Sequence, residues 1–386
     1  MERLGDILTL HLPKTLAFGK GSAVRLADDL AAGPRRRVFV ITSRLVLPLA
    51  EPWSQSLRQR GLEVSVWEGV NREPTVTDFQ AALKAAQAMN ADAIIGFGGG
   101  SALDVAKLVA AMLDNPQDIH EVFGIGKLAG RSTFLVCLPT TAGTGSEVSP
   151  NAILLDESEH VKKGVISPHL VPDVTCVDPL LTRTLPPAVT ASTGLDALTH
   201  CIEAYANRFA HPVIDHYALE GIRLIAGSLR RAFDCGDDLD ARARMALGSL
   251  YGGLCLGQVN TGAVHALAYP LGSEFHVAHG VANAVMLPHV LEFNLSAAPE
   301  SYAQVALALG AVPSGSTLET ARCALSLVCE LSRHCQIPRS LSELGVPESA
   351  VPRLAKGAMK ITRLLERNVR HVTEEDAVAI YRKAFL

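Results

Sequence analysis

The first half of the chain alternates short apolar runs with segments of helical period. RRVFVIT (36–42) is an apolar run after a basic cluster and predicts a buried strand. Phe79, Leu83 and Ala86 share one face of a helix expected over 77–90. In all, the pattern predicts strands over 36–42, 62–70 and 132–141, helices over 47–61 and 77–90, and within 91–115 a strand, a glycine turn and a helix. Such alternation predicts a parallel sheet covered by helices on both faces.

The pattern changes after LPPAVTAS (185–192). From there onward the period is mostly helical, as in 241–256 and 317–335, and Pro186 and Pro187 indicate a loop followed by a helix start. We therefore expect a Rossmann-like α/β domain over residues 1–185 and an all-helical domain over 186–386.

Composition narrows the function classes. The 386 residues are 48% hydrophobic and 19% charged, and the formal net charge of −4 offers no electrostatic reason to bind nucleic acid or a membrane surface. The eight cysteines form no CxxC pair, which argues against a disulfide framework or a cysteine-based zinc site. The N-terminal segment is a poor signal peptide, and no apolar run approaches the ~20 residues of a membrane span. We expect a cytoplasmic protein with a small-molecule substrate.

GFGGGSALDVAK (96–107) is the first candidate for binding chemistry. Its glycines let the backbone approach a ligand, and the following helix offers unpaired N–H groups to a pyrophosphate. Ser101 and Asp104 have the spacing of a capping box. Because Ser101 occupies the last glycine position of GxGxxG, an ordinary strand-to-helix turn remains an alternative.

A second loop of small and hydroxylic residues, PTTAGTGSEVSPN (139–151), also follows a predicted strand. Its hydroxyl groups, from Thr140, Thr141, Thr144 and Ser146, suit ribose and phosphate oxygens. Two such loops at the ends of successive strands favour a nucleotide crevice, where α/β sheets bind ligands.

A candidate metal site begins in GLDALTHCIEAY (194–205). Asp196 and His200 are four residues apart and share one helix face. Together with His265 and His279 they would form a set of one carboxylate and three imidazoles, which suits divalent iron or zinc. Taken singly, an ion pair or packed core histidines would explain the same residues.

At these residues the sequence resembles the iron-containing (group III) alcohol dehydrogenase family, over essentially the whole chain. The motifs that carry the resemblance are FGKGS (18–22), GGGSALDVAK, PTTAGTGSEVS, GLDALTHCIEAY and HALAYPLGSEFHVAHGVANAVMLPHVLEFN (265–294). The resemblance implies the two-domain fold shared with dehydroquinate synthase and a catalytic metal, Fe2+ or alternatively Zn2+. The implied metal ligands are Asp196, His200, His265 and His279.

The resemblance also implies that NAD or NADP binds to the two loops. The implied pyrophosphate residues are Gly98, Gly99 and Ser101, and Asp104 of the same turn is included in the cofactor site. The ribose and nicotinamide positions are Thr140, Thr141, Thr144 and Asn151, with Lys162 on a cofactor ribose and Lys163 as its neighbour in an uncertain register.

The sequence departs from the family pattern at two places. Many members carry a second histidine four residues after the first ligand of the segment, where this chain has Tyr269, so we name Tyr269 and His276 as candidates for proton transfer. Many NAD-dependent members have an aspartate after the first strand, where this chain has Ser43 followed by Arg44. Without that carboxylate, an arginine can pair with a 2′-phosphate, so NADP use is a hypothesis.

Just before His265 the chain carries Gln258, Asn260 and Thr261, which are more polar than expected. If they face the substrate, it carries a second oxygen group; alternatively they are hydrogen-bonded inside the helical domain. We expect a metal-dependent, NAD(P)-linked alcohol dehydrogenase or aldehyde reductase for a small alcohol, diol or semialdehyde, and a homodimer or larger oligomer. The alternatives are a maleylacetate-reductase-like enzyme, a dehydroquinate-synthase-like lyase and a metal-free binding relative.

Overall fold

The computed structural model describes residues 5–159 and 161–385. The chain divides into two compact units. An α/β unit consists of Leu10–Thr141 and Gly145–Arg183. A helical unit consists of residues 5–9, Ala142–Thr144 and 184–385. Residues Ala142–Thr144 lie in the loop after the predicted strand 132–141, and they group with the helical unit and not with the sheet.

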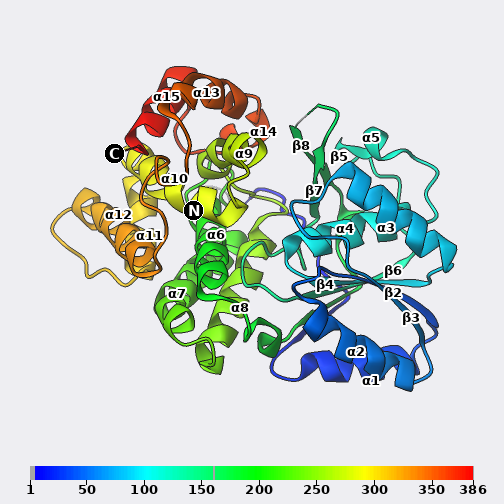
Figure 1. The fold of residues 1–386 in the computed structure, drawn as a ribbon. Coiled ribbons are helices and arrows are strands. Elements are labelled where there is room, and N and C mark those ends of the chain that lie inside the picture. The colour runs from blue at the N-terminus through cyan, green and yellow to red at the C-terminus, as the bar shows by residue number, and fades with distance from the viewer. Residues whose placement is uncertain (1–4, 160, 386) are drawn as a thin grey trace. The chain divides into compact units, whose positions relative to one another are not determined.

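The α/β unit is built on a parallel sheet (Figure 1). Among the described residues it has six strands: β1 (Thr15–Phe18), β2 (Arg37–Ile41), β3 (Glu63–Trp67), β4 (Ala93–Gly98), β6 (Phe134–Pro139) and β9 (Val174–Val177). Their order across the sheet is β1-β9-β6-β4-β2-β3, and every neighbouring pair is parallel. The predicted parallel sheet is confirmed.

Alternate residues of the strands build two separate cores. Val38 and Val40 of β2 pack on the side of helices α1 (Ser22–Ala32) and α2 (Leu47–Gln59). Phe39 and Ile41 pack on the opposite side, with α3 (Val76–Ala88) and α4 (Gly100–Met112). The period-two pattern of a strand buried on both faces therefore directs each pair of helices to its own face (Figure 1).

A smaller sheet in the same unit was not predicted. It joins β5 (Gly124–Ile125), β7 (Asn151–Asp156) and β8 (Val161–Ile166) in the order β5-β8-β7, with β7 and β8 antiparallel. The unit also has the short helix α5 (Ile119–Val122) and single 3-10 turns at Pro168–Leu170 and Pro179–Thr182. β7 follows the polar loop 139–151 directly and contains the apolar run AILL (152–155), a strand signal that the prediction omits.

The second unit is helical throughout its longer elements, as predicted. Its helices are α6 (Pro187–Tyr205), α7 (Pro212–Asp234), α8 (Leu239–Cys255), α9 (Ala263–Phe275), α10 (His279–Asn294), α11 (Pro299–Ala308), α12 (Thr317–His334), α13 (Val351–Met359), α14 (Thr362–Leu365) and α15 (Glu374–Lys383). α6 packs against α7, α8 and α10, and its residues 194–204 are all buried. No helix in the described part of the chain has the length and apolarity needed to cross a membrane.

The capping box predicted for α4 is wrong. Gly99 occupies the N-cap, no side chain caps the helix, and Ser101 lies inside its first turn. The carboxylate of Asp104 instead accepts hydrogen bonds from Ser146 Oγ at 2.5 Å and from the Ile153 amide at 3.0 Å. Asp104 therefore ties α4 to the loop 139–151 and to β7.

Lys107 extends this tie from the next turn of α4. Its side chain is fully buried, and its Nζ donates to Asn151 O at 2.7 Å and to Ser146 Oγ at 2.9 Å. Burial lowers the pKa of Lys107. Glu147 is buried in the same loop, and burial raises its pKa to about 7 although Lys107 opposes the shift.

We predict from Glu147 that the free energy of unfolding falls as the pH rises from about 4.5 to about 7. In this window the folded protein retains a proton that the unfolded chain has released, and the slope contributed by one group is at most about 1.4 kcal/mol per pH unit. Glu147→Gln cannot titrate and removes this contribution. Urea denaturation of both proteins at pH 5 and pH 8 measures it, and Glu220→Gln at an exposed carboxylate is the control. Equal pH dependence of wild type and Glu147→Gln would contradict the prediction.

Candidate metal centre and cofactor-binding loops

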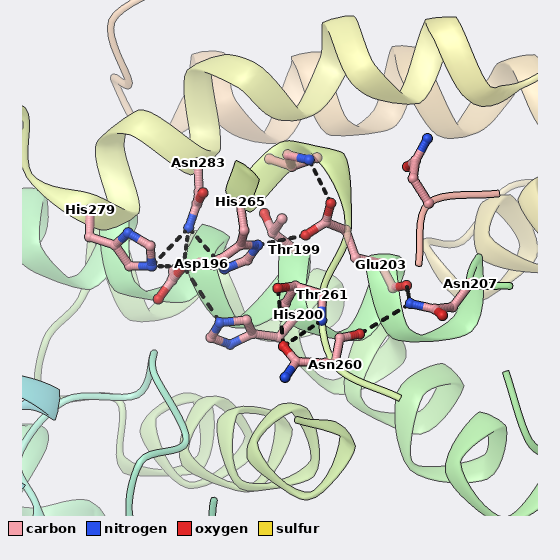
Figure 2. A network of polar contacts seen from close by, with 12 residues as sticks. Asp196, Thr199, His200, Glu203, Asn207, Asn260, Thr261, His265, His279 and Asn283 are labelled. Carbon is pink, nitrogen blue, oxygen red and sulfur yellow. Dashed lines mark hydrogen bonds and ion pairs between the residues drawn. The ribbon is translucent and has the colours of Figure 1, made fainter. Parts of the chain in front are cut away.

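Three helices bring the four predicted metal ligands together (Figure 2). α6 carries Asp196 and His200 one turn apart, so both side chains leave the same face. His265 lies in the first turn of α9, and His279 is the first residue of α10. Asp196, His200 and His265 are buried, whereas the side chain of His279 is 33% exposed.

The distances between the donor atoms are those of a possible metal-ligand set. Asp196 Oδ1 lies 3.6 Å from His265 Nε2, 3.7 Å from His279 Nε2 and 3.9 Å from His200 Nε2. Ligands of a tetrahedral ion at ~2.1 Å are separated from one another by about 3.4 Å. The donor atoms of Asp196, His265 and His279 all lie within 4.8 Å of one another, and the His200 ring stacks on His265 at 4.8 Å between centroids.

Asn283, one turn after His279 on α10, occupies the space among these donors. Its Nδ2 donates to Asp196 Oδ1 at 2.7 Å and lies 3.1 Å from His265 Nε2 and 3.2 Å from His279 Nε2. The amide nitrogen thus lies where three donor atoms converge, as a cation would. Asn283 Oδ1 is buried without a hydrogen-bond partner among the described residues. The position of the amide nitrogen agrees with a site that accepts a positive ion.

The protonation of the cluster reflects competition between burial and charge. Burial alone would raise the pKa of Asp196, but the neighbouring imidazoles outweigh it and lower that pKa well below its usual range. Burial lowers the pKa of His200 to about 4. Burial also acts against the charged form of His265, but the carboxylates of Asp196 and Glu203 raise its pKa to about 9. A divalent ion that binds His265 therefore has to displace a proton.

Sequence reasoning missed two residues of this cluster, Glu203 and Asn283. Glu203 Oε2 lies 2.5 Å from His265 Nδ1, on the side of the ring away from Asp196. A signal was available for both residues. Glu203 is seven residues after Asp196 on one helix, and Asn283 is four after His279, so each shares a face with a predicted ligand.

The two candidates for proton transfer have different surroundings. The ring of Tyr269 lies 5.9 Å from the ring of His279, and Tyr269 is half-buried. His276 ends α9 in the left-handed conformation, with φ 56°, and is exposed.

Asn260 and Thr261, just before His265, are hydrogen-bonded within the helical unit. Asn260 Oδ1 accepts from the amide of Thr261 at 2.8 Å, and Asn260 O accepts from Asn207 Nδ2 at 3.2 Å. These internal bonds remove the support that Asn260 and Thr261 gave to a second oxygen group on the substrate.

The two loops predicted to bind the cofactor are adjacent in the α/β unit. β4 and β6 are paired in parallel, with Gly98 opposite Pro139, and the Thr140 amide donates to Gly98 O at 2.9 Å. The glycine turn and the start of loop 139–151 therefore lie at the same carboxyl edge of the sheet, where α/β proteins bind nucleotides. Ser43 follows β2, the next strand on the other side of β4.

Buried groups at this edge fit a dinucleotide. A Cβ at Gly98 would lie 2.7 Å from Ala102 Cβ, so the turn admits no side chain at this position. Thr140 Oγ1 and Asn151 Oδ1 are buried without a partner among the described residues, as expected of groups that bind a polar ligand. Thr141 Oγ1 would lie 3.5 Å from a Cβ at Gly99.

Two other predicted cofactor residues, Thr144 and Lys162, are placed differently. Thr144 belongs to the helical unit. Lys162 has a nearly buried side chain whose Nζ lies 2.5 Å from Glu73 Oε1. Lys163, next to it on β8, pairs with Asp156 at 2.9 Å, and consecutive strand residues point to opposite faces. The register therefore gives the two lysines separate acidic partners.

Comparisons with known proteins agree over nearly the whole chain. Residues 13–179 match the family described as "Iron-containing alcohol dehydrogenase", and residues 190–385 match "Fe-containing alcohol dehydrogenase family, C-terminal". The chain is 40% identical to 1,3-propanediol dehydrogenase of Klebsiella pneumoniae over 330 residues, which is 85% of each chain. It is 34% identical to lactaldehyde reductase of Escherichia coli (strain K12) over 379 residues, which covers 97% of this chain and 98% of the relative.

A solved structure of 1,3-propanediol oxidoreductase superimposes with a TM-score of 0.95 at 35% identity, covering 98% of this chain and all of the other. Membership of the family implies a metal ion and a nicotinamide dinucleotide, and the donor cluster and the orphaned loop groups fit both. On these observations, the chain belongs to the iron-containing alcohol dehydrogenase family and is an alcohol dehydrogenase.

Proposed function

We propose that Asp196, His200, His265 and His279 hold the catalytic divalent ion of a dehydrogenase that interconverts a small alcohol or diol and its aldehyde. The observation that carries the proposal is the convergence of three imidazole nitrogens on Asp196 Oδ1 at 3.6–3.9 Å. One carboxylate and three imidazoles suit Fe2+, with Zn2+ as the alternative. The names of two relatives, 1,3-propanediol dehydrogenase and lactaldehyde reductase, support substrates with a short carbon chain and more than one oxygen.

Each residue of the cluster has its own proposed role in catalysis. When bound, the ion supplies Lewis acidity to the substrate oxygen while the nicotinamide accepts or returns the hydride. Asp196 contributes the one negative charge of the ligand set, and the histidines contribute neutral nitrogen donors. We assign the proton transfer to Tyr269, whose ring lies 5.9 Å from that of His279.

The cofactor is proposed to be NADP, bound through the carboxyl edge of β2, β4 and β6. Arg44 is 76% exposed, and its Nε lies 3.5 Å from Glu68 Oε1. An exposed ion pair of this kind contributes only ~0–1 kcal/mol to stability, so its pairing with Glu68 leaves the Arg44 guanidinium able to bind a phosphate. Ser43 supplies no negative charge that would repel a 2′-phosphate.

Family resemblance also supports a cytoplasmic homodimer or larger homo-oligomer. Sedimentation of the purified protein would test the oligomeric state.

Removing a ligand should release the ion. We expect Asp196→Ala and His265→Ala each to weaken Zn2+ or Fe2+ binding at least about tenfold and to abolish most of the activity, because each deletes one donor atom. Metal analysis after dialysis and steady-state rates measure this. His334→Ala, at a partly exposed histidine paired with Asp234, is the matched control. Unchanged metal content in both ligand variants would refute the site.

Cofactor preference tests the role of Arg44. We expect a higher kcat/KM with NADP than with NAD, and Arg44→Ala to lower kcat/KM for NADP about tenfold or more with little change for NAD. Arg25→Ala, at another exposed arginine with an acidic neighbour, is the control. A strong preference of the wild type for NAD would overturn the NADP proposal and leave the metal site untouched.

Substitution of Tyr269 and of His276 tests which of the two side chains transfers the proton. Tyr269→Phe keeps the ring against His279 and deletes only the hydroxyl, so we expect kcat to fall by about 10²-fold, the scale of a general acid–base contribution. His276→Ala should have the smaller effect because His276 is exposed. Single-turnover rates of hydride transfer measure both variants. A larger loss of rate in His276→Ala than in Tyr269→Phe would assign the proton transfer to His276.

A further inference from the structure

Glu203 contacts a metal-ligand histidine from the side opposite the other ligands. Its side chain is 6% exposed, at the C-terminal end of α6. Oε2 lies 2.5 Å from His265 Nδ1, and Oε1 accepts a hydrogen bond from the Val264 amide at 2.6 Å (Figure 2). Both carboxylate oxygens are thus engaged by neighbouring residues at the start of α9.

The start of α9 needs an external acceptor. The first amides of a helix have no partner within it, and the N-cap of α9 is Gly262, which offers no side chain. Glu203 supplies that acceptor from another helix, with its negative charge at the positive end of α9. A Cβ at Gly262 would lie 3.2 Å from Glu203 Oε1, so glycine at this position leaves room for the carboxylate.

The same carboxylate selects the tautomer of His265. Glu203 is an acceptor toward Nδ1, so that nitrogen carries the proton in the neutral ring. Nε2, which lies 3.6 Å from Asp196 Oδ1, then keeps its lone pair directed at the cluster. A hydrogen-bonded partner on the far nitrogen also fixes the plane of the ring and raises its basicity.

Glu203 is itself held in place by backbone contacts. Its carbonyl accepts from Asn207 Nδ2 at 3.0 Å, and the same nitrogen donates to Asn260 O at 3.2 Å. Asn260 adopts the left-handed conformation, with φ 66°, two residues before Gly262. This chain of bonds joins the end of α6 to the segment that starts α9 (Figure 2).

We propose that Glu203 is a positioning residue for the metal centre, which holds His265 in the orientation and tautomer that bind the ion. The proposal rests on the metal site proposed above. A carboxylate satisfies two donors, the Val264 amide and His265 Nδ1–H. A carboxamide has only one acceptor oxygen, so glutamine in this place either leaves one donor unpaired or presents N–H to Nδ1 and forces the proton onto Nε2.

Glu203→Gln therefore tests the proposal with little change of shape. We expect the affinity for Zn2+, measured by chelator competition, to fall about 10- to 100-fold. With Co2+ as the probe, the visible absorption of the bound ion should change because an imidazole donor is lost or displaced. Glu274→Gln, which removes a partly exposed carboxylate from the same helix as His265, should bind both ions as the wild type does.

Two further variants keep the outcome decisive. If Glu203→Gln does not fold, Glu203→Asp retains the charge but is one carbon too short to reach both donors, and its Zn2+ affinity should lie below that of the wild type. Wild-type affinity and an unchanged Co2+ spectrum in a folded Glu203 variant would overturn the proposal. His265→Ala distinguishes the two levels. If it too binds metal normally, the metal site itself fails; if it loses the ion while the Glu203 variants keep it, only the positioning role fails.

Discussion

The helical unit depends on one electrostatic constraint, the burial of a carboxylate among imidazoles. Asp196 is 2% exposed, and removing such a charge from water costs several kcal/mol unless partners compensate. Three imidazoles and the Asn283 amide provide that compensation at 2.7–3.9 Å. Because the four proposed ligands come from α6, α9 and α10, the geometry of the site depends on how these helices pack.

The contacts of Glu203 link the packing of these helices to the geometry of the site. One oxygen accepts from the Val264 amide at the start of α9, and the other lies against His265 Nδ1. One carboxylate therefore contacts both the start of α9 and a proposed metal ligand, so the position of α9 and the orientation of the His265 ring depend on the same side chain.

In the α/β unit, buried charge has a comparable structural role. The Lys107 side chain is fully buried and that of Asp104 is 15% exposed, and both bind the loop 139–151 through Ser146. That loop begins at the carboxyl edge of β6, beside the glycine turn. The interior bonds hold the loop, while Thr140 Oγ1 and Asn151 Oδ1 have no hydrogen-bond partner among the described residues.

The sequence alone determined the parallel sheet, the change to helices after residue 185 and the Asp196–His200 pair, because strand and helix periods are local properties. For His265 and His279 the sequence offers only the residue type and the family resemblance, because their separation of 65 residues or more from His200 carries no information on distance. Only the tertiary structure decided the partners. It placed Asp104 on Ser146 instead of in a capping box, buried Asn260 and Thr261 in internal bonds, and brought Glu203 and Asn283 to the cluster. A polar side chain pairs with whichever donor or acceptor the folded chain brings nearest, and for these residues that group is distant in the sequence.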